Sequence, residues 1–160
     1  MSEKYQKNYI LLTGGAGYIG SSVAYYLLKS GKNVIILDNF SNSNCNNIES
    51  LPNKHNLVVL NINCCNYKSL ENIFISYHID VVVHFAGFKA VAESIQKPML
   101  YYENNLISSI NMLKICAEYD VRRFIFSSSF SNCIPIWLLF RSAPTMRMEK
   151  ITRMIISAIR

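Results

Sequence analysis

The chain has 160 residues, of which 51% are hydrophobic, which is enough for one domain with a real core. No stretch resembles a membrane span or a cleavable signal, so we expect no membrane partner. The net charge of +6 is concentrated in residues 141–160, which hold five basic side chains and one acidic one. The first 140 residues carry 11 basic and 9 acidic groups. This balance gives no support to nucleic-acid binding.

The five cysteines and three histidines show no spacing typical of metal ligands. Cys64 and Cys65 are neighbours and the other cysteines are scattered, which favours reduced thiols in a cytoplasmic protein. His84 ends an apolar run, where we expect a hydrogen-bonded structural histidine rather than a ligand. We therefore predict no metal site.

The first apolar run, residues 9–12, predicts a buried strand, and residues 21–29 predict the helix that follows. Between them the chain reads TGGAGYIG, with Gly14, Gly17 and Gly20. The first glycine allows a tight turn, the second lets the backbone approach a pyrophosphate, and the third lets helix and sheet pack closely. Phosphates would lie at the helix N-terminus, where free N–H groups and the helix dipole favour an anion.

A second apolar run, residues 34–37, ends in Asp38, 18 residues after Gly20. A carboxylate there can accept hydrogen bonds from the adenosine ribose hydroxyls. The glycines alone could belong to an ordinary flexible loop. Their place between a strand and a helix, with an acid after the second strand, favours dinucleotide binding. A polar loop, residues 39–47, follows.

The rest of the chain predicts three more strands and two more helices. The strands are residues 57–62, 80–85 and 123–127, and the helices are residues 68–76 and 99–119. One side of the longer helix carries the apolar residues Leu100, Ile107, Ile110, Leu113 and Ala117. Strands that alternate with helices predict an α/β fold of the Rossmann type. Its doubly wound parallel sheet would have helices on both faces.

Six segments, in this order and spacing, resemble UDP-glucose 4-epimerase of the extended short-chain dehydrogenase/reductase family. They are TGGAGYIG (13–20), DNFSNS (38–43), HFAGFKAV (84–91), ESIQKP (93–98), YYENN (101–105) and FIFSSS (124–129). The resemblance covers residues 7–129, and its HFAG and QKP segments are far more specific than the glycines. It implies NAD as the cofactor.

The resemblance also implies a role for individual residues. Tyr18 and Ile19 belong to the pyrophosphate turn, and the adenosine ribose and nearby phosphate are held by Asp38, Asn39, Phe40, Ser41, Asn42 and Ser43. The adenine lies beside Asn61 and Ile62, and the nicotinamide end is lined by Phe85, Ala86, Gly87, Phe88 and Lys89. The longer helix contributes Asn104, and the catalytic serine that bonds the reacting sugar hydroxyl is Ser129.

Some of these positions have simpler interpretations. Asn61 stands where the family has an aspartate, which keeps an acceptor, loses the charge and predicts weaker adenine recognition. Lys89 could be a solvated loop cation and Asn104 an ordinary polar helix residue. Residues 127–129 could merely end a strand.

The sequence departs from the family where catalysis takes place. In the family a tyrosine deprotonates the sugar 4-hydroxyl while hydride passes to NAD+, and a lysine four residues later lowers the pKa of that tyrosine. No tyrosine follows Tyr119, and the only Tyr-x-x-x-Lys pattern, Tyr25 to Lys29, is expected on a helix surface. We also expect the second domain that would hold the UDP-sugar to be absent. We expect a truncated sheet without epimerase activity.

Residues 130–160 form a tail that does not resemble the family. The codons TTC-AGC-AAC-TGT-ATA-CC can encode residues 130–135, and reading them one base later gives Ser-Ala-Thr-Val-Tyr, the family's continuation. Our hypothesis is that a frameshift alters the chain after Ser129, which resequencing of the gene would test. The domains are then 7–129, which binds NAD, and 130–160, the tail.

Two classes of function follow. The first is NAD-dependent interconversion of UDP-glucose and UDP-galactose in galactose metabolism, with this chain as the cofactor-binding half. The alternatives are a non-catalytic NAD-binding module, or another nucleotide-sugar epimerase or dehydratase of the same superfamily. The resemblance also implies a UDP-sugar substrate and a homodimer formed through the helix at residues 99–119.

Overall fold

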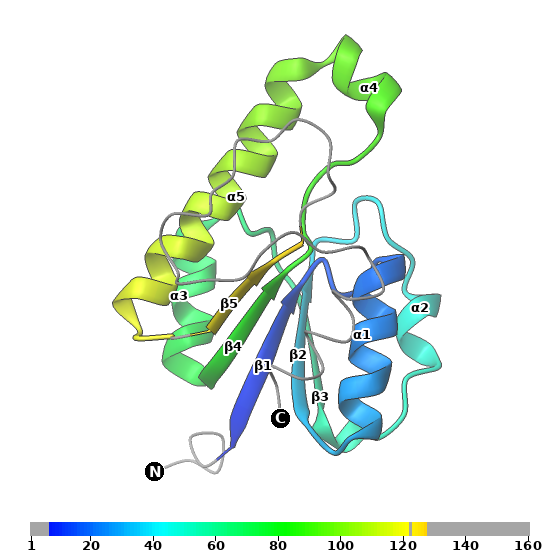
Figure 1. Ribbon diagram of the computed structural model, residues 1–160, viewed down its shortest axis with the longest axis vertical. Coiled ribbons are helices and arrows are strands. Elements are labelled where there is room, and N and C mark those ends of the chain that lie inside the picture. Colours follow the sequence, from blue (N-terminus) through cyan, green and yellow to red (C-terminus); the bar gives the residue numbers. More distant parts are fainter. Residues whose placement is uncertain (1–6, 122, 128–160) are drawn as a thin grey trace, which may run out of the picture.

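The computed structural model describes residues 7–121 and 123–127 (Figure 1). The elements are β1 (Asn8–Thr13), α1 (Tyr18–Lys29), β2 (Asn33–Asp38), α2 (Asn46–Glu49), the 3₁₀ helix η2 (Lys54–Asn56), β3 (Leu57–Asn61), α3 (Tyr67–Ser76), β4 (His78–His84), α4 (Val91–Gln96), α5 (Pro98–Glu118) and β5 (Arg123–Phe126). None of the helices in these two ranges has the length and hydrophobicity that a membrane crossing requires.

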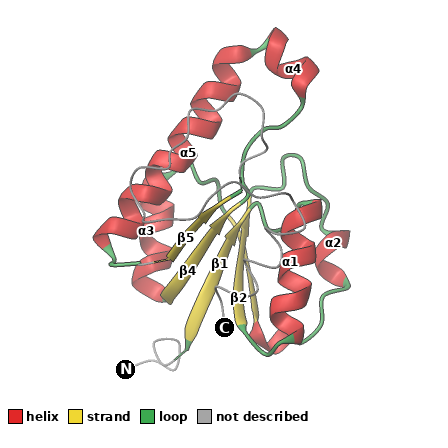
Figure 2. Ribbon diagram, viewed as in Figure 1, coloured by secondary structure: helices red, strands yellow, loops and turns green. Residues whose placement is uncertain are grey.

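The five strands form one parallel sheet in the order β3-β2-β1-β4-β5. The chain first builds outward from β1 to β3 and then crosses back to add β4 and β5 on the other side of β1; Figure 2 shows β2 on one side of β1 and β4 and β5 on the other. The strand order therefore reverses between β1 and β4, which is where ligands bind in sheets of this kind. The predicted α/β fold with a doubly wound parallel sheet is confirmed.

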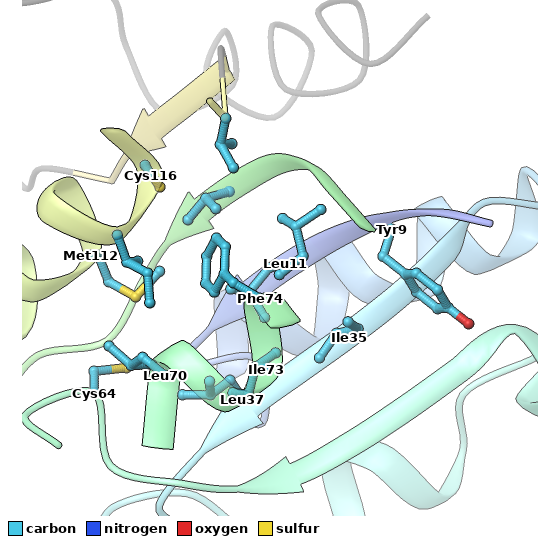
Figure 3. Close-up of a cluster of buried hydrophobic side chains, with 14 residues drawn as sticks. Tyr9, Leu11, Ile35, Leu37, Cys64, Leu70, Ile73, Phe74, Met112 and Cys116 are labelled. Carbon is cyan, nitrogen blue, oxygen red and sulfur yellow. The ribbon is translucent and has the colours of Figure 1, made fainter. Parts of the chain in front are cut away.

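Helices cover both faces of the sheet, with α1 and α2 on one face and α3 and α5 on the other (Figure 1). Alternate residues of each strand therefore enter different cores. In β1, Leu11 joins Phe74 and Met112 in the core beneath α3 and α5 (Figure 3), whereas Leu12 packs with Leu28 beneath α1. Because β1, β2 and β4 are covered on both faces, they are mostly apolar rather than alternating.

Most element boundaries lie within two residues of the predicted ones, but α1 begins three residues earlier than predicted, at Tyr18. Gly17 is its N-cap, with an extended backbone and no side-chain hydrogen bond to the helix end. Tyr18, Ile19 and Gly20 thus form the first turn of the helix. The glycine motif supplies both the turn and the start of the helix.

The apolar side of α5 that the sequence indicates is not its buried face. Leu100, Ile107 and Ile110 are between 43% and 47% exposed. The buried face instead consists of Tyr101, Ser108, Ser109, Met112, Ile115 and Cys116. The two buried serines make this face look polar in the sequence, yet both donate to the carbonyl of Asn105. A buried hydroxyl with a partner costs little, so the face can pack against the sheet.

Candidate functional site

The residues predicted to bind the dinucleotide gather at the carboxyl edge of the sheet. Each group follows a different strand: residues 14–20 follow β1, residues 38–43 end β2 and follow it, residues 61–62 close β3, and residues 85–89 follow β4. Since the strands are parallel, these segments lie at one edge, where the strand arrows in Figure 1 converge.

Glycines allow the turn after β1 to lie tightly against its neighbours. Gly14 has a φ of +65°, and a Cβ there would lie 2.8 Å from the backbone nitrogen of Ala86. A Cβ on Gly20 would lie 2.5 Å from the carbonyl oxygen of Gly14. The third glycine of the motif therefore packs against the turn. Close packing on the sheet belongs instead to Gly15, whose Cβ would lie 2.9 Å from Ile36 Cγ2.

The N-terminus of α1 can receive an anion. The first turn contains no acidic residue, and no side chain caps it. The first N–H groups of a helix have no partner within the helix and carry the positive end of its dipole. The Tyr18 side chain is exposed and leaves this end open. The arrangement suits one or two phosphate groups.

Asp38 joins this turn to the loop after β2. Its carboxylate is buried and accepts hydrogen bonds from the Ala16 N–H (3.0 Å), the Phe40 N–H (2.9 Å) and the Ser43 hydroxyl (2.8 Å). Asn47 donates to the Ala16 carbonyl at 2.8 Å. Both backbone polar groups of Ala16 are thus held by the loop, and Asn47 is a contributor that the sequence motif does not reveal.

The end of β3 lies directly beside Asp38. The Ile62 N–H donates to the Asp38 carbonyl at 3.1 Å, which extends the sheet by one bond beyond the strand. Asn61 is exposed and Ile62 half-buried. A contact of either residue with an adenine stays a prediction.

Two elements hold the loop after β4. At its start, the Phe85 N–H donates to the Thr13 carbonyl at 2.9 Å. Further along, Asn105 contacts Phe88 twice: its Oδ1 accepts from the Phe88 N–H at 2.8 Å, and its Nδ2 donates to the Phe88 carbonyl at 3.1 Å. Gly87, with a φ of +155°, leaves room for this amide. The sequence motif points to Asn104 but does not reveal this role of its neighbour Asn105.

Asn104 lies between two of the loops at this edge. Its Nδ2 donates to Asn105 Oδ1 at 3.0 Å, and the Cys65 thiol, in the loop after β3, lies 3.6 Å from its carbonyl oxygen. A contact between Asn104 and a cofactor stays a prediction. Ser129, and with it the whole tail, lies outside the described residues.

Two lysines differ in position: Lys89 lies in the loop after β4, among the predicted site residues, whereas Lys29 ends α1. Partial burial of the Lys89 ammonium lowers its pKa below the ordinary value of 10.5. In contrast, Lys29 lies at the far end of α1 from the turn, with its Nζ 5.9 Å from the centre of the Tyr25 ring. The Tyr-x-x-x-Lys pattern of α1 is thus a surface contact, as the sequence analysis expects.

His84 is buried between β1 and α5. Its Nδ1 lies 2.6 Å from the Thr13 hydroxyl and its Nε2 3.2 Å from the Ser109 hydroxyl, while the ring stacks on Phe126. Burial, and secondarily the charge of Lys89, lower the pKa of His84 to about 4. Its predicted role as a structural, hydrogen-bonded histidine is confirmed.

Comparison with known proteins agrees with this geometry. A family model described as GDP-mannose 4,6 dehydratase matches residues 11–131. The chain belongs to this family. Among its curated relatives, the UDP-glucose 4-epimerase of Yersinia enterocolitica is 43% identical over 127 residues, which are 75% of this chain and 36% of the relative. The chain spans between 22% and 38% of the length of the first curated relatives it matches.

Solved structures of epimerases share the fold. The UDP-glucose 4-epimerase of Thermotoga maritima with UDP-glucose has a TM-score of 0.70 and 34% identity, covering 76% of this chain and 38% of the other. That of Bifidobacterium longum in complex with NAD+ and UDP has a TM-score of 0.71 and 32% identity, covering 94% and 49%. The resemblance inferred from the motifs is confirmed.

The buried histidine predicts how stability depends on pH. Because the pKa of His84 falls from 6.5 to about 4 on folding, the unfolded chain binds more protons between these values. The contribution of the neutral His84 imidazole to the free energy of unfolding is fully present above pH 6.5 and is lost as the pH falls through 4. We expect the loss to reach about 3 kcal/mol, measured by urea unfolding across this range. In a His84→Phe variant the pH dependence should be weaker; an unchanged slope would contradict the assignment.

Proposed function

We propose that the chain binds NAD+ as the cofactor half of a UDP-glucose 4-epimerase type of enzyme. One observation carries the proposal: an uncapped helix N-terminus and a buried carboxylate, Asp38, meet at the carboxyl edge of the sheet, beside the point where the strand order reverses. The Bifidobacterium longum relative, whose structure contains NAD+ and UDP, supports this choice of dinucleotide.

The residues present fit this cofactor. No side chain caps the first turn of α1 and the Tyr18 side chain is exposed, so a diphosphate can approach the N–H groups of this turn. Asp38 Oδ2 accepts one bond from the protein, and a carboxylate oxygen can accept a further one from a ribose hydroxyl. The segment from Phe85 to Lys89 would lie at the nicotinamide end. When bound, NAD+ supplies the hydride acceptor, and the chain supplies position and charge.

Removing the charge of Asp38 should weaken NAD+ binding. Asp38→Asn keeps the size but replaces an acceptor by a donor that repels the Ala16 N–H, so we expect about a tenfold or greater loss of NAD+ affinity in calorimetric titration. Asp80→Asn is the matched control, because Asp80 lies at the opposite edge of the sheet, in an ion pair with Arg123. Equal affinities of the two variants would refute the role of Asp38.

We propose UDP-glucose and UDP-galactose, and thus galactose metabolism, as the substrates and setting of the whole enzyme. The supporting observation is the identity of the curated relatives. For the 160-residue chain itself we expect no turnover, because no tyrosine follows Tyr119. Loss of a catalytic acid or base typically costs about 10²–10⁴-fold.

A coupled UDP-galactose assay separates the remaining functions. NAD+ binding without turnover supports the cofactor half or a non-catalytic binding module. Turnover of UDP-galactose by this chain would contradict our expectation. Activity on a nucleotide sugar that loses water would instead favour a dehydratase, the reaction named in the family model's description.

We further propose that the family-like part ends at Ser129 and that residues 130–160 are a separate tail. The match of the family model, which stops at residue 131, supports this boundary.

We also propose a homodimer, which the apolar outer face of α5 supports. Large side chains recur along it at helical spacing: Met99, Tyr102, Leu106 and Ile110 are between 47% and 65% exposed.

A charge on this face should prevent dimerisation. Ile110→Lys places an ammonium at the C-terminal end of the exposed stripe, and burying it unpaired in an interface is costly. We expect sedimentation velocity to show a dimer for the unchanged chain and a monomer for this variant. Tyr26→Lys on α1, on the other face of the sheet, is the control and should stay dimeric. A monomeric unchanged chain would refute the proposal.

A further inference from the structure

The loop after β4 is held at two points by different elements. Near its start, the Ala86 N–H points to the Thr13 hydroxyl of β1, 3.4 Å away. Three residues after Phe85, Phe88 is held by the side chain of Asn105 on α5. The shape of the loop therefore depends on the position of β1 relative to α5.

His84 and Ser109 connect these two anchors through the interior. The hydroxyl of Ser109 has one proton, which it donates to the Asn105 carbonyl at 2.7 Å. It must therefore accept from His84 Nε2, which carries the imidazole proton. His84 Nδ1 is then an acceptor, and the Thr13 hydroxyl donates to it at 2.6 Å. The bonds run in one direction, from Ala86 to Asn105.

These bonds close a ring around the loop. It passes from Ala86 through Thr13, His84 and Ser109 to Asn105, whose side chain returns to Phe88. The structure describes no buried side-chain polar atom without a partner in residues 7–121 and 123–127. Removing one member therefore leaves others unpaired in the interior, which is costly.

We infer that His84 is a positioning residue: as a neutral imidazole it couples β1 to α5 and so holds residues 85–89 in the shape that receives the nicotinamide half of the dinucleotide. This inference rests on the proposed function. The direction of the bonds requires one donor and one acceptor on the ring. A protonated imidazole has two donors and would conflict with the Thr13 proton. Lys89, the nearby cation, opposes that protonation.

The experiment compares two ligands. ADP contains the parts that the glycine turn and Asp38 would hold, whereas NAD+ adds the half that reaches residues 85–89. His84→Phe keeps the aromatic packing on Phe126 but removes both hydrogen bonds. We expect the full chain with this substitution to bind NAD+ about tenfold more weakly and ADP within about twofold of the unchanged chain. A loss of folded protein alone would weaken the apparent binding of both ligands equally.

Two serine variants make the test independent of the larger substitution. Ser109→Ala removes the ring member that bonds His84, so NAD+ binding should fall by about threefold relative to ADP binding. Ser108→Ala is the matched control: Ser108 is buried on the same helix and bonds the same carbonyl at 3.2 Å, but lies outside the ring. Its ratio of NAD+ to ADP affinity should be unchanged.

The outcomes separate this inference from the proposed function. If the unchanged chain binds NAD+ and the ratio falls in His84→Phe and Ser109→Ala but not in Ser108→Ala, the inference holds. If the unchanged chain binds NAD+ and all four proteins share one ratio, the inference is overturned while the proposed function stands. If the unchanged chain binds neither NAD+ nor ADP, both are overturned.

Discussion

The close approach of two backbones determines the geometry of the site. The turn after β1 and the loop after β4 come so near that a single carbon on Gly14 would lie 2.8 Å from the Ala86 nitrogen. Because β1 and β4 are adjacent parallel strands, both segments leave the sheet at the same edge. The turn proposed to hold the diphosphate and the loop proposed to hold the nicotinamide therefore lie close enough for one dinucleotide to reach both.

Polar side chains fix the backbone conformation of the loops, which the glycines leave free. Glycine permits a close approach but also many other conformations. In this chain the conformation is specified by bonds from distant residues: Asp38 and Asn47 hold the two backbone groups of Ala16, and Asn105 holds those of Phe88. Asp38 on β2 and Asn105 on α5 lie on elements with buried residues, so the positions of these loops depend on the packing of the two cores.

The interior of the sheet is consequently not purely apolar. Thr13, His84 and Ser109 are buried polar residues on β1, β4 and α5. Buried hydrogen bonds are directional, and they restrict the relative position of these elements more than apolar contacts do. The stability of the fold is consequently sensitive to pH, since these hydrogen bonds need a neutral imidazole at His84.

The sequence alone determined the parallel sheet, its helices and the residues along its carboxyl edge, because strand and helix periods, glycine spacing and the acid after β2 are local features. It also indicated that His84 is structural. Only the tertiary structure decided which face of α5 is buried, since the buried Ser109 also contacts His84, which lies on another element. The same holds for the anchors Asn47 and Asn105, because a hydrogen bond between residues far apart in the chain has no local signature.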